Sequence, residues 1–267
     1  MRPDCGKMKR MRQDRSQAGY RSGWYRTADA ILTPMIASMT IRSWSGQQHI
    51  PAEGGAVIAA NHVSHIDPLT LAHFLNETGR AVRYLAKDSL FEAPVVGQVL
   101  AGAGQIPVHR GASDAGDALR SAVAAVRAGE VLVVYPEGSL TRDPDEWPMR
   151  GKTGAARVAL ATGAPVIPVA QWGPQNLLPP YSKRLRLVGR TPVQVTAGPA
   201  VDLDDLHGQA GDPEAVHEAT DRIMAAITEL LAGIRGAPAP EQRFDPRAAG
   251  MSEYGDPRKR QKRRKAR

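Results

Sequence analysis

A histidine and an aspartate five positions apart are the residues of this sequence best suited to move a proton. Residues 61–67 read N-H-V-S-H-I-D and directly follow the apolar run 56–60. A histidine imidazole can accept a proton near neutral pH, and a carboxylate bound to its other ring nitrogen fixes the tautomer and stabilises the imidazolium. A tight turn between a strand and a helix can bring His62 and Asp67 together, which predicts a general-base dyad. A capped helix start with a surface histidine explains the same spacing and stays open as the alternative.

The sequence places no serine or cysteine where it would be activated as a nucleophile. Ser139 lacks the G-x-S-x-G frame of a nucleophile elbow, and Cys5 is the only cysteine, so a disulfide framework and a zinc cluster are excluded. His65 is two positions from Asp67, and we interpret it as a local hydrogen-bonding residue. A dyad without a protein nucleophile favours direct attack by a substrate hydroxyl, and no metal site is expected.

Two further polar segments suit the binding of an anion. Residues 104–110 read G-Q-I-P-V-H-R and end on Arg110, whose guanidinium can bind a phosphate through two parallel hydrogen bonds. Residues 135–142 read Y-P-E-G-S-L-T-R, in which a tight turn can direct backbone N–H groups towards an anion. Glu137 beside that turn can accept substrate hydroxyls or hold a neighbouring arginine. Taken singly, the two segments also fit a solvated charge and an ordinary exposed turn.

A fourth segment is apolar and carries two prolines. Residues 164–169 read A-P-V-I-P-V. Proline cannot donate in a sheet, so the pattern predicts an edge strand or an irregular segment. Such a segment could line a groove for an acyl chain or a pantetheine arm, and plain core is the alternative.

Alternating strands and helices must position these segments. Strands are expected at residues 56–60, 82–86, 105–108, 131–135 and 165–170, with a hairpin at 185–188 and 193–197. Helices are expected at residues 68–75, 93–103, 113–127, 153–162 and 212–234. This alternation predicts a single α/β domain with a largely parallel sheet flanked by helices. Function in such sheets lies at the ends of the strands.

The charge of the chain is concentrated at its two ends. The 267 residues carry a net charge of +8, and 42% of them are hydrophobic, which excludes wholesale disorder. Residues 1–26 hold eight cations and two acids, and residues 258–267 hold eight cations and no acid. The body, 27–257, is left with 19 cations and 25 acids, so the pI near 9.9 describes the ends.

A helical pattern follows the basic N-terminus. Apolar residues between 31 and 39 recur at the spacing of one helix face, and aromatic and arginine residues flank them. That pattern predicts an amphipathic helix over 24–44 lying in a membrane interface, with a helix packed on the core as the alternative. We therefore divide the chain into a basic flexible N-terminus (1–23), a membrane-interface helical segment (24–44), a domain (45–235) and a flexible basic tail (236–267).

Taken in order, the four segments resemble the glycerolipid acyltransferase family, which includes the lysophosphatidic acid acyltransferases. Residues 61–67 resemble its N-H-x-x-x-x-D signature, and 104–110 its second motif, with Arg110 at the phosphate-binding position. Residues 135–138 resemble its F-P-E-G block with tyrosine for phenylalanine, and 166–169 its fourth motif. The resemblance covers about residues 40–200.

The resemblance implies transfer of an acyl group from acyl-CoA or acyl-carrier protein, as co-substrate and without a cofactor, to the hydroxyl of 1-acyl-sn-glycerol 3-phosphate. His62 would be the general base and Asp67 would orient it. The residues implied for glycerol phosphate are Arg110, Glu137, Gly138, Ser139 and Arg142. Those implied for the acyl-donor side are Val166, Ile167 and Pro168.

Two other functions remain open from the sequence. One is a related acyltransferase that uses another lysophospholipid or glycerol 3-phosphate. The other is a nucleic-acid-binding protein that uses the basic ends, although the body is acidic and offers no aromatic stacking platform. The resemblance and the charge together predict a peripheral enzyme on the cytoplasmic face of the cell membrane, held there by anionic headgroups.

Overall fold

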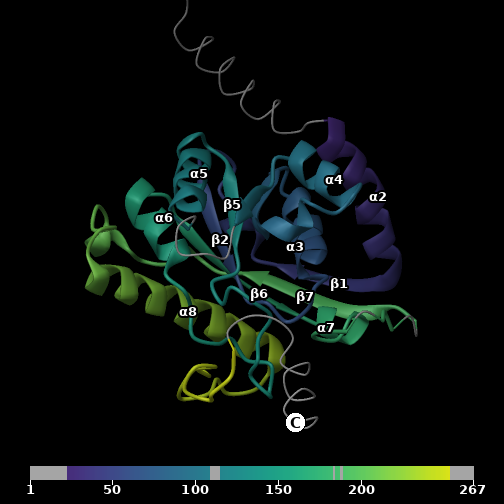
Figure 1. Ribbon diagram of the computed structural model, residues 1–267. Coiled ribbons are helices and arrows are strands. Elements are labelled where there is room, and N and C mark those ends of the chain that lie inside the picture. Colours follow the sequence, from purple (N-terminus) through teal and green to yellow (C-terminus); the bar gives the residue numbers. More distant parts are fainter. Residues whose placement is uncertain (1–22, 109–114, 183, 187–188, 253–267) are drawn as a thin grey trace, which may run out of the picture.

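A twisted sheet with helices on both faces forms the centre of the molecule (Figure 1). The computed structural model describes residues 23–108, 115–182, 184–186 and 189–252. The strands are β1 (Thr40–Ser45), β2 (Ala56–Ala60), β3 (Val82–Lys87), β4 (Ile106–Val108), β5 (Val131–Val134), β6 (Val166–Trp172) and β7 (Thr191–Ala197). The α-helices are α2 (Gly23–Met39), α3 (Asp67–Asn76), α4 (Val96–Gly102), α5 (Ala115–Arg127), α6 (Gly154–Thr162), α7 (Pro174–Leu177) and α8 (Pro213–Arg235). Short 3-10 turns occupy Gln47–His49, Asp88–Leu90 and Asp204–Leu206.

The sheet is largely parallel, as the alternation predicts. Its order is β1-β7-β6-β2-β5-β3-β4, and within the described residues every neighbouring pair is parallel except β6 and β7. Parallel strands share one edge for their carboxyl ends. The segments that follow β2, β5 and β6 therefore emerge side by side, which is where a site is expected.

Two apolar layers hold the helices on the sheet. Helices α5, α6 and α8 pack on one face, against β2, β5 and β6. Helix α3 packs on the other face with Leu71, Phe74 and Leu75. Because both faces are covered, β2 and β5 are buried at every position, which explains why they are continuous apolar runs in the sequence.

Both ends of α8 are capped by residue types that favour the start and the end of a helix. The Asp212 side chain accepts a hydrogen bond from the Glu214 N–H at 2.9 Å, and Pro213 occupies the first turn. Gly236 ends the helix in the left-handed conformation with φ of +59°, which a side chain would strain. The helix expected at 212–234 is confirmed.

The helix predicted over 24–44 ends at residue 39, where its apolar spacing ends, and the flanking residues do not continue it. Helix α2 stops at Met39, and Thr40–Ser45 forms the edge strand β1, which pairs in parallel with β7. Arg190 donates to the carbonyls of Ala37 and Thr40, which satisfies the end of the helix. Trp44 packs edge-on against Phe74 at 5.8 Å, so tertiary contacts select the strand. Within the described residues, no helix is long and apolar enough to span a bilayer.

Two other expectations about the C-terminal third are also wrong. Strand β7 pairs with β6 and β1, and the described residues 185–186 form no strand beside it, whereas residues 187–188 of the predicted hairpin lie outside the described residues. The segment 236–252, expected to be part of a flexible tail, lies against the domain: Arg150 N–H donates to the Phe244 carbonyl at 3.0 Å, and Arg243 pairs with Asp221. The basic ends 1–22 and 253–267 lie outside the described residues.

Candidate active site

His62 and Asp67 meet at the carboxyl end of β2. The His62 Nδ1 atom lies 2.9 Å from Asp67 Oδ2, and that oxygen also accepts the backbone N–H groups of Val63 at 2.6 Å and Ser64 at 2.8 Å. The Asp67 side chain is fully buried, whereas 16% of the His62 side chain is exposed. The turn from β2 into α3 therefore closes the predicted pair and leaves the imidazole accessible.

The surroundings of Asp67 define which imidazole nitrogen is free. Burial raises the pKa of Asp67, and its hydrogen bonds from His62, Ser64 and Val63 act against that increase. Three donors on one oxygen favour the carboxylate, which can only accept. The proton shared with Asp67 is then on Nδ1, so Nε2 presents its lone pair and can take a proton from a hydroxyl.

A stack of rings supports the imidazole from the neighbouring strands. The His62 ring lies 4.2 Å from the Tyr135 ring at 19°, and Tyr135 lies 6.4 Å from Tyr84 at 17°. The Tyr84 hydroxyl donates to the Pro68 carbonyl at 2.8 Å, which ties the stack to the start of α3. Sequence reasoning took Tyr135 only as the aromatic residue of a motif and missed this contact. The position of Tyr135 after β5, next to β2, is the signal that could have found it.

Glu137 is a positioning residue in this structure. Its Oε1 accepts the His62 backbone N–H at 2.9 Å, and its Oε2 accepts the Met149 N–H at 3.0 Å. The residue is 2% exposed, and burial raises its pKa to about 8. The expectation that Glu137 binds glycerol phosphate therefore has to be corrected: its carboxyl group holds the backbone of the dyad in place.

The other residues expected around the phosphate lie in different environments. Gly138 has φ of +69°, and a side chain there would lie 3.0 Å from Lys152 Cδ, a residue that sequence reasoning did not connect with this turn. Ser139 is half-buried, and its hydroxyl donates to the Leu140 carbonyl at 3.2 Å. Arg142 is 6% exposed, so it lies inside the loop and not on its surface. Arg110 lies outside the described residues.

The segment expected on the acyl-donor side is part of the core. Strand β6 lies between β2 and β7, so it is an interior strand and not an edge strand. Val166 packs in the layer under α6 and α8, Ile167 packs in the layer under α3, and Pro168 is buried. The Pro168 carbonyl accepts the Gly198 N–H at 2.9 Å. In a strand, the nitrogen and the carbonyl of one residue face the same neighbouring strand. The Pro168 nitrogen, which has no hydrogen to donate, therefore faces the residues that follow β7. Its lack of an N–H removes no hydrogen bond between β6 and β2.

Asn61 fastens the end of β2 to β6. Its side chain donates to the Gln171 carbonyl at 3.0 Å and accepts the Gln171 N–H at 2.8 Å. The Gln171 side chain returns a hydrogen bond to the Asn61 carbonyl and accepts one from Thr70 Oγ1 of α3 at 3.0 Å. All three residues are buried, so β2, β6 and α3 are fixed directly beneath the dyad.

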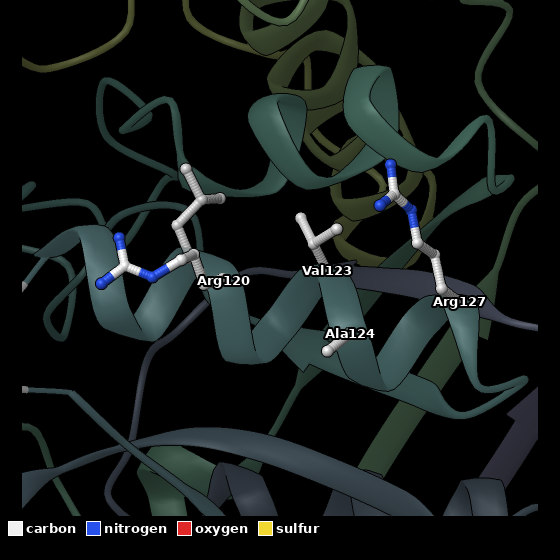
Figure 2. Close-up of a pocket in the computed structure, with 5 residues that line it drawn as sticks. Arg120, Val123, Ala124 and Arg127 are labelled. Atoms are coloured by element: carbon white, nitrogen blue, oxygen red, sulfur yellow. The ribbon is translucent and has the colours of Figure 1, made fainter.

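Other polar groups and hollows do not form a second centre. His65 is exposed, and its ring meets the Tyr181 ring edge-on at 6.4 Å. Figure 2 shows a shallow hollow on the outer face of α5, lined by Leu119, Arg120, Val123, Ala124 and Arg127, none of which belongs to the site around His62. Within the described part of the chain, no three His, Cys, Asp or Glu side chains gather as ligands for a metal ion.

Comparison with known proteins indicates the family to which the chain is similar. The sequence model of a family described as Acyltransferase matches residues 42–172. An uncharacterized protein of Mycobacterium leprae is 29% identical over 252 residues, which cover 78% of this chain and 66% of that protein. A 1-acyl-sn-glycerol-3-phosphate acyltransferase of Bacillus subtilis is 28% identical over 130 residues, covering 49% of this chain and 62% of that protein. The chain thus spans about two thirds of the length of these relatives.

A solved structure shares the fold. The crystal structure of the 1-acyl-sn-glycerophosphate acyltransferase PlsC from Thermotoga maritima superposes with a TM-score of 0.58 at 20% sequence identity. The match covers 90% of this chain and 86% of that one.

Proposed function

The chain belongs to the acyltransferase family, and on that premise we propose that it moves a fatty acyl group from acyl-CoA or acyl-carrier protein to the free hydroxyl of 1-acyl-sn-glycerol 3-phosphate, giving phosphatidic acid. The observation that supports this most directly is the pair formed by the His62 imidazole and the buried Asp67 carboxylate at 2.9 Å. The names of relatives that act on this acceptor support the choice of substrate.

The reaction proceeds by direct attack of the acceptor hydroxyl. His62 Nε2 takes the hydroxyl proton while the oxygen forms a bond to the thioester carbonyl carbon. The carbon–sulfur bond then breaks, and the imidazolium returns the proton to the leaving thiolate. Asp67 holds the ring orientation and stabilises the imidazolium throughout, so no acyl-enzyme is formed.

In this proposal Arg110 binds the acceptor phosphate, together with the turn 138–142. The two segments follow β4 and β5, whose carboxyl ends lie on the same edge of the sheet as the end of β2. Arg110→Ala should raise the acceptor KM at least tenfold, because a charged hydrogen bond to a phosphate contributes about 1.5–3 kcal/mol. An acceptor KM equal to that of wild type would remove Arg110 from the site. Arg127→Ala, on the outer face of α5, is the control.

Exposed apolar side chains support a membrane as the place of the reaction. Helices α2 and α4 contact each other. Six large exposed apolar side chains lie on α2 and around α4: Trp24, Ile31, Met35, Leu90, Val95 and Val96. The exposed positions 31, 34, 35 and 38 of α2 carry no charge, whereas the solvent face of a globular helix is normally polar. We propose that these residues rest in the headgroup region of a bilayer, which holds the lipid acceptor, as a peripheral contact.

The test is transfer from a defined acyl-CoA, with products identified by mass spectrometry. His62→Ala should lower kcat by at least a thousandfold, and Asp67→Asn by a hundredfold or more, by roughly the amounts that general-base dyads contribute. Circular dichroism should show that both variants keep the fold. Transfer by His62→Ala near the wild-type rate would overturn the assignment. A panel with lysophosphatidylinositol and glycerol 3-phosphate separates the proposed acceptor from the alternatives.

A further inference from the structure

We propose that a second segment, between α7 and β7, binds anionic lipid headgroups and brings the bilayer to the mouth of the His62 site. This segment, called the basic loop below, comprises residues 178–182 and 184–186. The inference rests on the proposed function, because it names a surface through which a lipid acceptor would reach that site. The features that carry it are the chemistry of the loop tip and the contacts that fix the loop.

The tip of the basic loop combines cations with an exposed apolar side chain. Arg184 and Arg186 are exposed, and among the described residues neither side chain forms an ion pair with a carboxylate. Leu185 between them is 46% exposed. Cations for phosphate groups and an apolar residue for the acyl boundary are what an anionic bilayer surface recognises.

The basic loop begins beside α2, the helix whose exposed positions 31, 34, 35 and 38 carry no charge. Leu178, at its start, and Leu177, the last residue of α7, pack with Ile36 and Met39 of α2. Just beyond the loop, Arg190 donates to carbonyls at the end of the same helix. Figure 1 shows α2 and α7 at the end of the sheet where β1 lies. The two segments can therefore touch one bilayer at the same time.

The same loop is fastened to the site on its other side. Ser64, which lies between His62 and Asp67 in the sequence, donates through its hydroxyl to the Leu178 carbonyl at 2.6 Å. The Tyr181 hydroxyl donates to the Leu140 carbonyl at 3.0 Å, in the loop after β5. A membrane bound at Arg184 and Arg186 would consequently lie beside the dyad, where an acceptor could pass from the bilayer without leaving it.

Binding to vesicles tests the charges. The full chain, Arg184→Ala/Arg186→Ala and the control Arg120→Ala/Arg127→Ala are compared by co-sedimentation with phosphatidylcholine vesicles, with and without phosphatidylglycerol. Both double variants lose the same charge, and the control pair lies on α5, away from the loop. At about 1 kcal/mol for each cation near an anionic surface, the loop variant should bind roughly thirtyfold more weakly to the anionic vesicles, and the control should match wild type. An equal loss in both variants would show a general charge effect and overturn the proposal.

Insertion of Leu185 is tested with a label. Cys5 is the only cysteine, so Cys5→Ser/Leu185→Cys carries one environment-sensitive fluorophore. Its emission should shift to the blue on addition of anionic vesicles, whereas a label on Cys5→Ser/Ala124→Cys, at an exposed position of α5, should not respond. A label at 185 that stays in water overturns the loop contact.

Neither binding assay depends on turnover, so the two proposals can fail separately. If no acceptor is acylated but the loop variant and the label respond as expected, only the acyl transfer reaction is wrong. If phosphatidic acid is formed but both assays give the control result, the proposed reaction stands and the lipid contact of the basic loop is wrong.

Discussion

Replacing Glu137 with glutamine should remove a pH dependence from the stability of this protein. The native carboxyl group has its pKa raised by burial to about 8, from an ordinary value of 4.5. The folded state therefore keeps a proton that the unfolded state releases. This contribution to stability is fully present below pH 4.5 and is lost as the pH rises towards 8.

The size of the effect follows from the two pKa values. Each pH unit between them lowers the free energy of unfolding by about 1.4 kcal/mol, so roughly 3 to 4 kcal/mol is lost between pH 5 and pH 8. Glutamine cannot ionise, and its amide nitrogen cannot accept one of the two backbone N–H groups that Glu137 binds, from His62 and Met149. That loss costs about 1–3 kcal/mol at every pH.

Urea denaturation of wild type and Glu137→Gln at pH 5, 6, 7 and 8 measures this difference. The stability advantage of wild type should be largest at pH 5 and should fall steadily towards pH 8. Other titrating groups are common to both proteins and cancel in the difference. Glu229→Gln, at an exposed position of α8, should leave the pH slope unchanged. An advantage that is constant, or that grows with pH, would show that the native Glu137 is ionised and would refute the reasoning.

Two further variants test the ring stack and the corrected role of β6. Tyr135→Leu removes the ring that lies on His62 and should lower kcat roughly twofold to tenfold, whereas Tyr135→Phe keeps the ring and should stay within about twofold of wild type; steady-state kinetics with both variants decides. Ile167→Val should lower the free energy of unfolding by about 0.5–1.5 kcal/mol without changing the KM of the acyl donor, because Ile167 is 2% exposed in the core. A raised donor KM with unchanged stability would instead return Ile167 to a donor groove.

The parts of the fold that were predictable are those in which local chemistry and burial agree. The strand Ala56–Ala60 is apolar throughout and is covered on both faces, so its pattern has only one satisfactory structure. Helix α8 carries an aspartate cap, a proline in its first turn and a glycine at its end, and it forms where these signals place it. Contacts within a few residues decide such elements.

Elements whose partners are distant in the chain were mispredicted. The predicted helix includes the aromatic and arginine residues that flank the helical pattern as far as Trp44, but pairing with β7 about 150 residues later makes Thr40–Ser45 a strand. The prolines of residues 165–168 indicated an edge, but Pro168 turns its missing donor away from β2, so β6 can be an interior strand. The hydrophobic periodicity of a segment does not indicate which distant strand will pair with it.

The candidate site divides in the same way. Local spacing was enough to predict that His62 and Asp67 could meet, since only four residues lie between them, and that a tight turn follows β5. In contrast, the contacts of Glu137 with the His62 backbone and of Tyr135 with the His62 ring are visible only in the folded chain. Those contacts cross from β2 to β5, which adjoin in the sheet although about 75 residues separate them in the chain. Residues a few positions apart are kept close by the covalent chain. Contacts between strands depend instead on which strands are neighbours in the sheet.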